Sequence, residues 1–240
     1  MLNQVKQAPF TAVFHRDMMA GARELFSDVI DIVPPSAWDH CMQLYGSGVR
    51  AYHTFEHALD VLWRVQVVQA TIGFVDYEAA VVAALFHDAV YEIGRLPGQN
   101  EERSLEEAYA VASRPGTTLS RDVVDRAAPL ILATALHGKH KMDARHDGDG
   151  VAWDVALFLD CDMAGFALAP PEFDKQNAAI DKEFMGKVEP ALYRTGRASF
   201  LENLKTRGVF LTPPFVRAGE AWAQANLLRE LARVDTWMAR

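Results

Sequence analysis

The segment at residues 79–90 is almost entirely apolar, and yet it contains His87 and Asp88. A second segment with helical periodicity contains His53 and His57, four residues apart. Burying an unpaired charge is costly, so buried charges in proteins are normally paired or bound to a metal. Imidazole and carboxylate groups together suit a divalent cation such as Zn, Mn or Fe. The pattern therefore predicts that the helices bring these polar side chains together at a metal centre.

A further polar interruption, LDCD, lies in the apolar segment at residues 157–167. Side chains four residues apart share one face of a helix, so His53 and His57 point the same way if the helix has already formed at residue 53. The directions of His87 and Asp88 differ by about 100° on a helix. Both could still reach one ion in a groove between helices, and the Asp88 carboxylate could bridge to a second ion.

Helical periodicity dominates the chain, whereas strand-like alternation bounded by turn residues is almost absent. Ser36, Asp76, Asn100 and Ser120 are each placed to cap a helix start. The sequence therefore predicts an all-α fold. Helices are expected at roughly residues 15–31, 36–46, 53–71, 76–91, 100–114, 120–138, 151–167, 171–186, 188–206 and 215–239.

The chain of 240 residues can form one large domain with a sizeable core, because half of its residues are hydrophobic. We expect a single domain over residues 1–240, with a core at about 36–170 and a helical extension at about 171–240. The net charge of −8 argues against nucleic acids and acidic membrane surfaces as partners. It is compatible with a small anionic substrate, since a metal ion inverts the local field.

Cys41 and Cys161 are the only cysteines, too few for a disulfide framework, which favours a reducing compartment. The N-terminus lacks a basic stretch followed by an apolar run, so no signal peptide is expected. The longest uninterrupted apolar run, at residues 79–86, is too short to span a bilayer. We therefore expect a cytoplasmic protein without membrane contacts, and self-association as a homodimer stays open.

The order of His57, His87–Asp88 and Asp162 resembles that of the HD superfamily of metal-dependent phosphohydrolases. One helix of the cyclic-nucleotide phosphodiesterases is similar to the string YHTFEHALDV. The resemblance implies an HD-domain helical bundle with a C-terminal helical extension. It implies that these four residues are the metal ligands and that His53 is the general acid.

A bacterial subfamily of predicted HD phosphohydrolases is a closer match and covers most of the chain. The shared motifs are YHTFEH, FHDAVYE, NEERS, ATALH, LDCDM, YRTGR and EAWAQANL. The dyad with its flanking ligands is specific for the superfamily, whereas the later motifs are specific for the subfamily and say little about substrate. The chain departs from the pattern at Thr54, where Asn is usual, and at Asp181 and Gln224, where basic residues are usual.

The resemblance also suggests roles for residues around the ligands. The register of LDCDM assigns the last ligand to Asp162, with Asp160 as the competing choice. Glu101 would orient the attacking water or the waters of a second ion, and His137 would bind the phosphate or a second metal. Candidate contacts to the anionic substrate are Arg194, Arg197, Lys139 and Lys141.

The implied activity is hydrolysis of a small phosphate ester, such as a nucleotide, with one or two divalent ions (Zn, Mn, Fe, Ni or Mg). The metal lowers the pKa of bound water towards about 7 and draws charge from the phosphoryl oxygens. Protonated His53 donates to the leaving oxygen. Two alternatives stay open. One is a di-iron oxygenase with further ligands among His137, His140 and His146, and the other is a non-catalytic ligand-sensing module.

Overall fold

The computed structural model describes residues 26, 29–137 and 150–238. Every regular element in that part of the chain is helical, which confirms the predicted all-α fold. The helix predicted at residues 15–31 and the polar loop at residues 138–150 lie almost wholly outside the described residues. Among the helices described, none combines the length and the apolar character needed to cross a membrane.

The α-helices are α2 (Pro35–Tyr45), α3 (Phe55–Thr71), α4 (Tyr77–Phe86), α5 (Gln99–Ala112), α6 (Arg121–Ala133), α7 (Gly150–Met163), α8 (Pro170–Phe184), α9 (Pro190–Arg207) and α10 (Pro213–Met238), and the short 3-10 helices are η4 (Thr134–Leu136) and η5 (Ala164–Ala167).

Two of the four predicted capping residues occupy the cap position. Asp76 and Ser120 each accept a hydrogen bond from the backbone amide three residues later. The capping predictions for Ser36 and Asn100 are wrong, because both residues lie inside helices. The side chain of Asn100 instead bonds both the amide and the carbonyl of Glu92, which fixes the loop before α5.

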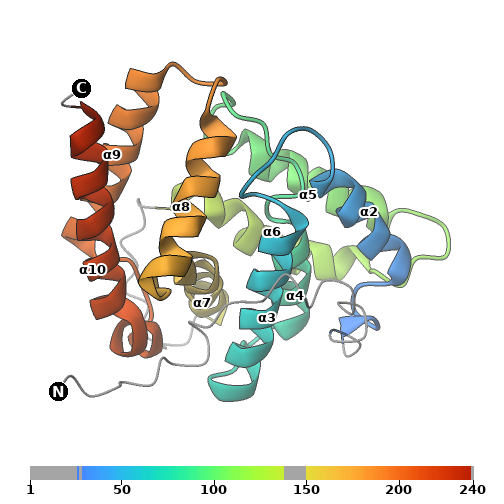
Figure 1. Cartoon of the computed structure of the whole chain (residues 1–240). Coiled ribbons are helices and arrows are strands. Elements are labelled where there is room, and N and C mark those ends of the chain that lie inside the picture. The colour runs from blue at the N-terminus through green and yellow to red at the C-terminus, as the bar shows by residue number, and fades with distance from the viewer. Residues whose placement is uncertain (1–25, 27–28, 138–149, 239–240) are drawn as a thin grey trace.

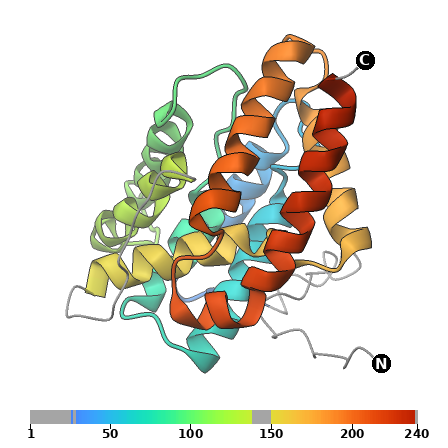
Figure 2. The same ribbon diagram turned by 90° about the vertical axis from the view of Figure 1, so that its left-hand side faces the viewer.

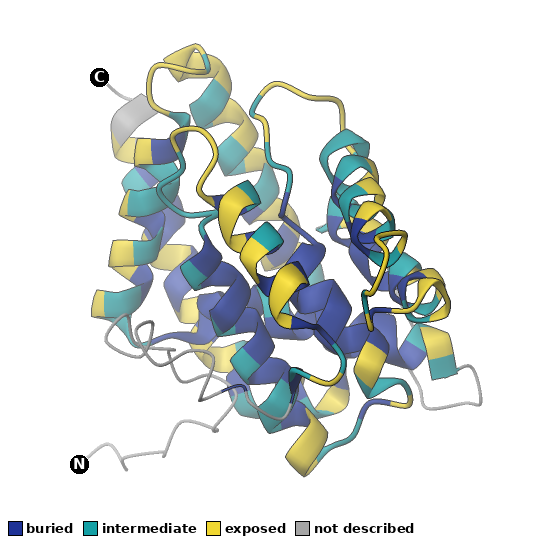
Figure 3. Cartoon of the chain, turned by 90° about the vertical axis from the view of Figure 1, so that its right-hand side faces the viewer, coloured by how far each residue is buried: buried dark blue, intermediate teal, exposed yellow. Residues whose placement is uncertain are grey.

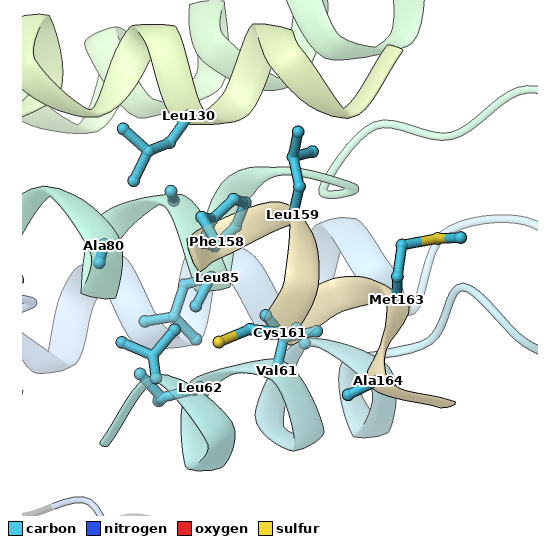
Figure 4. Packing of buried hydrophobic residues seen from close by; sticks show 14 of the residues in the cluster. Val61, Leu62, Ala80, Leu85, Leu130, Phe158, Leu159, Cys161, Met163 and Ala164 are labelled. Carbon is cyan, nitrogen blue, oxygen red and sulfur yellow. The ribbon is translucent and has the colours of Figure 1, made fainter. Parts of the chain in front are cut away.

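Helices α4 and α7 are buried along almost their whole length and form the centre of the molecule. Helix α4 packs against α2, α3, α5, α6 and α7, as its continuous apolar sequence requires. Figure 4 shows Leu62, Leu85, Leu130 and Phe158 meeting in this core from α3, α4, α6 and α7. In Figure 3 the buried residues gather on the faces that the helices turn towards each other, and the exposed residues lie on the outer faces of the helices and in the loops.

Helices α8, α9 and α10 stand together on one side of the molecule (Figures 1 and 2). Buried polar side chains tie this part to the core. The Asp160 carboxylate of α7 accepts hydrogen bonds from the amides of Leu211 and Thr212, at 2.7 and 2.8 Å. The amide group of Asn226, on α10, donates to the carbonyl of Phe166 at 2.8 Å. These bonds hold the C-terminal helices in a defined position over the ends of α7 and η5.

The helix predicted at residues 76–91 is too long, because α4 ends at Phe86. The Arg50 guanidinium donates to the carbonyls of Asp88 and Ala89, both at 2.9 Å. The chain leaves the α-helix at His87, and these two bonds hold the segment that follows it.

The helix predicted at residues 120–138 is also too long. The α-helix ends at Ala133 and continues as the single 3-10 turn η4. The Thr134 hydroxyl donates to the carbonyl of Ile131 at 2.8 Å, a side-chain bond that competes with regular helix geometry. His137 follows the end of this turn, where the backbone becomes extended.

Candidate metal centre

Three ligand-type side chains meet at a buried junction of α3 and α4. His57 lies in the first turn of α3, His87 caps the end of α4, and Asp88 follows it. The two Nε2 atoms are 3.3 Å apart, and Asp88 Oδ2 lies 3.6 Å from His57 Nε2 and 3.3 Å from His87 Nε2. One donor atom from each residue lies within 4.8 Å of the other two, which is close enough for a single cation.

Asp162 of α7 adds a fourth donor to this cluster. Its Oδ1 lies 3.1 Å from His57 Nε2 and 3.7 Å from His87 Nε2, and its Oδ2 lies 2.7 Å from His137 Nε2. The neighbouring Asp160 points elsewhere, since both of its oxygens accept hydrogen bonds from the backbone after α9. The geometry thus places Asp162, rather than Asp160, with the predicted ligands.

The charges in the cluster are strongly interdependent. Burial disfavours the His87 imidazolium, but the carboxylates of Asp88 and Asp162 outweigh burial and raise the pKa of His87 to about 9. Burial likewise opposes ionisation of the two acids, but the neighbouring imidazoles hold the pKa of both carboxyls well below the usual range. Two buried carboxylates therefore need a positive charge close by, which either a proton on His87 or a cation can provide.

The His87 ring is oriented by the backbone of its own helix. Its Nδ1 lies 3.1 Å from the carbonyl oxygen of Ala84. A carbonyl oxygen can accept a hydrogen bond but cannot donate one, so Nδ1 carries a proton. The lone pair of a neutral ring is then on Nε2, the atom that faces the cluster. A hydrogen bond of this kind on the other ring nitrogen is the usual support of a histidine that binds a metal.

His53 stands beside the cluster but not on α3. The helix predicted from residue 53 begins at Phe55, and the amides of residues 51–53 before it all donate to one oxygen of Glu183, at 2.7, 2.7 and 3.0 Å. The other oxygen of Glu183 accepts a hydrogen bond from His53 Nδ1 at 2.5 Å. The condition for His53 and His57 to share a helix face is not met, and a carboxylate from α8 orients the His53 ring instead.

The remaining contacts of His53 direct its Nε2 towards the ligands. This atom lies 4.0 Å from Asp88 Oδ2, and the ring stacks on Tyr91 with centroids 3.7 Å apart. Burial opposes ionisation of Glu183, but its bond to His53 outweighs burial and lowers the pKa of Glu183 to about 2. A carboxylate that is firmly ionised accepts the hydrogen bond from His53 Nδ1 and so fixes the tautomer of the ring.

A cavity of about 860 Å³ opens from the cluster. Glu101, His137 and Arg197 line it, whereas Arg194 does not. Glu101 lies in the first turn of α5, and partial burial raises the pKa of its carboxyl. The Arg197 guanidinium is held on the cavity wall by the amide oxygen of Asn177. Of the other predicted residues, Lys139, Lys141, His140 and His146 lie outside the described part of the chain.

Sequence reasoning missed Glu183 and Tyr91. Glu183 belongs to none of the motifs that were singled out, but a signal for it exists on α8. It lies three residues after Ile180, so the two side chains are neighbours on the surface of the helix. An acid on an apolar helix face indicates a buried partner in the same way as His87 does. Tyr91 is part of the motif FHDAVYE, and its ring stacks on His53 from the segment after α4.

Comparison with known protein families and with curated proteins returns no match for this chain. The resemblance to HD phosphohydrolases therefore rests on the sequence motifs, and the geometry of the candidate metal centre is the structural observation that bears on function.

Proposed function

We propose that this protein is a metal-dependent hydrolase of a small phosphate ester. The observation that carries the proposal is the convergence of His57, His87, Asp88 and Asp162 at one end of a cavity, with His53 Nε2 beside them. A structural ion pair would need only two of these groups. Four donor side chains from three helices, opening into a cavity, are better explained by a cation that acts on a ligand.

The chemistry of the donor set fits a divalent cation. Imidazole nitrogen and carboxylate oxygen together suit Zn, Mn, Fe or Ni, and Mg would depend mainly on the carboxylates. The lone pair of His87 is already directed inwards by the Ala84 carbonyl. A bound cation would supply charge to offset the phosphoryl oxygens and would acidify a water molecule for attack. Asp162, which also contacts His137, is the donor best placed to serve a second ion.

His53 is the proton donor in the proposed reaction. Its Nδ1 is committed to Glu183, so the proton available for catalysis is the one on Nε2. That atom faces the ligand end of the cavity, where it would protonate the leaving oxygen. Glu183 keeps the ring in place while the proton leaves, the role that a buried acid has beside a catalytic histidine.

Three other residues of the cavity have supporting roles in this proposal. Glu101 is half-buried and would accept a hydrogen bond from the attacking water or from water around a second ion. His137 would contact a phosphoryl oxygen or a second cation beside Asp162. Arg197 would contact the substrate from the cavity wall.

A di-iron oxygenase is the competing proposal for the same residues. It needs further histidine ligands between Asp88 and Asp162, and His137 is the one candidate within the described residues. Aerobic assays of iron-loaded protein, with spectroscopy for coupled irons, test this chemistry. Turnover with Zn or Mn as the only metal would exclude it.

The proposed hydrolysis is tested by phosphate release from a panel of phosphate esters with metal-loaded protein. We expect Asp88→Ala to lose the activity, with Asp174→Ala as the matched control, because Asp174 is exposed and pairs with Arg229 on the surface. Full turnover by Asp88→Ala would refute the proposal. Inactivity of wild-type protein on all esters, with tight retention of a metabolite, would instead favour a ligand-sensing module.

A further inference from the structure

The cavity extends far beyond the residues that the proposed chemistry uses. Its volume of about 860 Å³ exceeds what one phosphate group fills. One wall of the cavity comes from η5, α8, the α8–α9 connection and α9, and it is mostly apolar. Its main apolar side chains are Phe166, Ile180, Phe184, Val188, Leu192 and Phe200.

The aromatic side chains of this wall support one another. Phe184 stacks on Tyr193 with centroids 5.0 Å apart and an interplanar angle of 20°, and Phe166 and Phe200 lie 6.4 Å apart. Phe184 and Phe200 are only partly buried, and Leu192 is 66% exposed. When a ligand covers apolar surface that faces a cavity, the complex is stabilised by about 25 cal/mol for each Å² removed from water. An apolar group of the ligand would be stabilised here.

The two guanidinium groups that line the cavity already have partners. Arg95 and Arg197 are the only arginine or lysine side chains among the described residues that line it. Arg95 pairs with Glu92 at 2.6 Å, and Arg197 is bonded to Asn177 and lies 3.7 Å from Glu230. A second or third phosphate group on the substrate would therefore have to compete with these partners for the two guanidinium groups. The charge of the cavity suits one anionic group, placed at the metal centre.

We propose that the cavity selects phosphomonoesters whose organic group is apolar or aromatic, over nucleoside di- and triphosphates and over phosphate esters of polyols. This inference rests on the proposed function, because it takes the metal centre as the position of the phosphate. The apolar wall provides the specificity, and the metal centre provides the reaction.

The reaction balances with water as the only co-substrate. The oxygen of water forms a bond to phosphorus, and the bond between phosphorus and the ester oxygen breaks. The ester oxygen takes the proton from His53 Nε2 and leaves as an alcohol. The proton released by the attacking water replaces the one that His53 has lost, and inorganic phosphate is the second product.

The test uses unbranched alkyl phosphates from ethyl to hexyl, because their leaving groups have nearly equal reactivity. With metal-loaded full-length protein, we expect kcat/KM to rise about two- to fourfold for each added methylene. Phe184→Ala should flatten this dependence. Leu228→Ala removes an exposed leucine of α10 that does not line the cavity, and it should leave the dependence unchanged. If Phe184→Ala does not give the circular dichroism spectrum of the wild type, Leu192→Ala makes the same test at an exposed position.

A binding measurement separates this inference from the proposed function. Alkylphosphonates are not hydrolysed, and we expect their Kd for the metal-loaded protein to fall as the chain lengthens. If the phosphonates behave in this way but no ester is cleaved, the proposed function fails and the apolar specificity stands. If ethyl, hexyl and glycerol phosphates are cleaved with equal kcat/KM, the inference is overturned while the function stands. Equal kcat/KM for ATP and hexyl phosphate would also overturn it.

Discussion

Glu183 accepts a hydrogen bond from His53 Nδ1 at 2.5 Å, although 130 residues separate the two in the sequence. The same carboxylate accepts hydrogen bonds from the amides of residues 51–53, which lie just before α3. Because Glu183 belongs to α8, the C-terminal helices contribute directly to the candidate active site. Their position over the core is therefore a condition for orienting His53.

Glu183→Gln tests the role of this carboxylate in catalysis. The variant keeps the size of the side chain, but the single amide oxygen of Gln cannot accept hydrogen bonds from both His53 and the three backbone amides. We expect kcat of the proposed hydrolysis to fall about 10- to 100-fold, since a general acid contributes about 10²- to 10⁴-fold. The metal content should not change. Steady-state kinetics measure kcat and elemental analysis measures the metal content, with Glu172→Gln on the same helix as the control. A kcat of Glu183→Gln within about twofold of the wild type would contradict the assigned role.

The stability of the fold at low pH should depend on the same residue. The bond to His53 outweighs burial and lowers the pKa of Glu183 from 4.5 to about 2 in the folded protein. Its contribution to the free energy of unfolding is therefore complete above pH 4.5 and is lost as the pH falls towards 2. Urea denaturation across this range should show that the free energy of unfolding of the wild type exceeds that of Glu183→Gln above pH 4.5 and that this difference shrinks as the pH falls. A difference between the two proteins that is independent of pH would argue against an ionised Glu183.

Asp160 and Asp162 should respond in opposite ways to the same substitution. Asp160→Asn weakens buried hydrogen bonds to Leu211 and Thr212, so we expect a loss of about 1–3 kcal/mol in the free energy of unfolding with metal affinity retained. Asp162→Asn should weaken metal binding by at least about 100-fold and leave the fold intact. Chemical denaturation and metal titration of both variants measure the contrast. The reverse pattern would assign the ligand to Asp160.

The affinity for metal should increase with pH. The carboxylates of Asp88 and Asp162 outweigh burial and raise the pKa of His87 to about 9, so below that pH a cation must displace a proton from His87. We expect the apparent Kd to weaken about tenfold for each unit that the pH falls below 9. Titration against a chelator of known affinity measures this dependence. A Kd that does not change with pH would mean that His87 is neutral without the metal.

Much of the fold could be predicted from local sequence. The helical segments follow from apolar periodicity, and the caps at Asp76 and Ser120 follow from their side chains. The polar interruption of α4 predicted that His87 and Asp88 would have partners, and the structure brings both together with His57. These predictions succeed because each depends on residues within one or two turns of a helix.

The ends of the helices near the metal centre could not be predicted in this way. Arg50 binds the carbonyls of Asp88 and Ala89 just after α4, and Glu183 binds the amides of residues 51–53 just before α3. Both partners are distant in sequence, and their bonds exist only after the helices have packed. The orientation of His53 depends on the same tertiary contacts, so its geometry could be found only in the folded chain.

The measurement that tests the metal centre most directly is elemental analysis of wild-type and Asp88→Ala protein after dialysis against a divalent metal. We expect at least about one equivalent of metal in the wild type and less than about a tenth of an equivalent in the variant. Circular dichroism should show that both proteins are folded and helical. Equal metal content in the two folded proteins would contradict a cation held by His57, His87, Asp88 and Asp162.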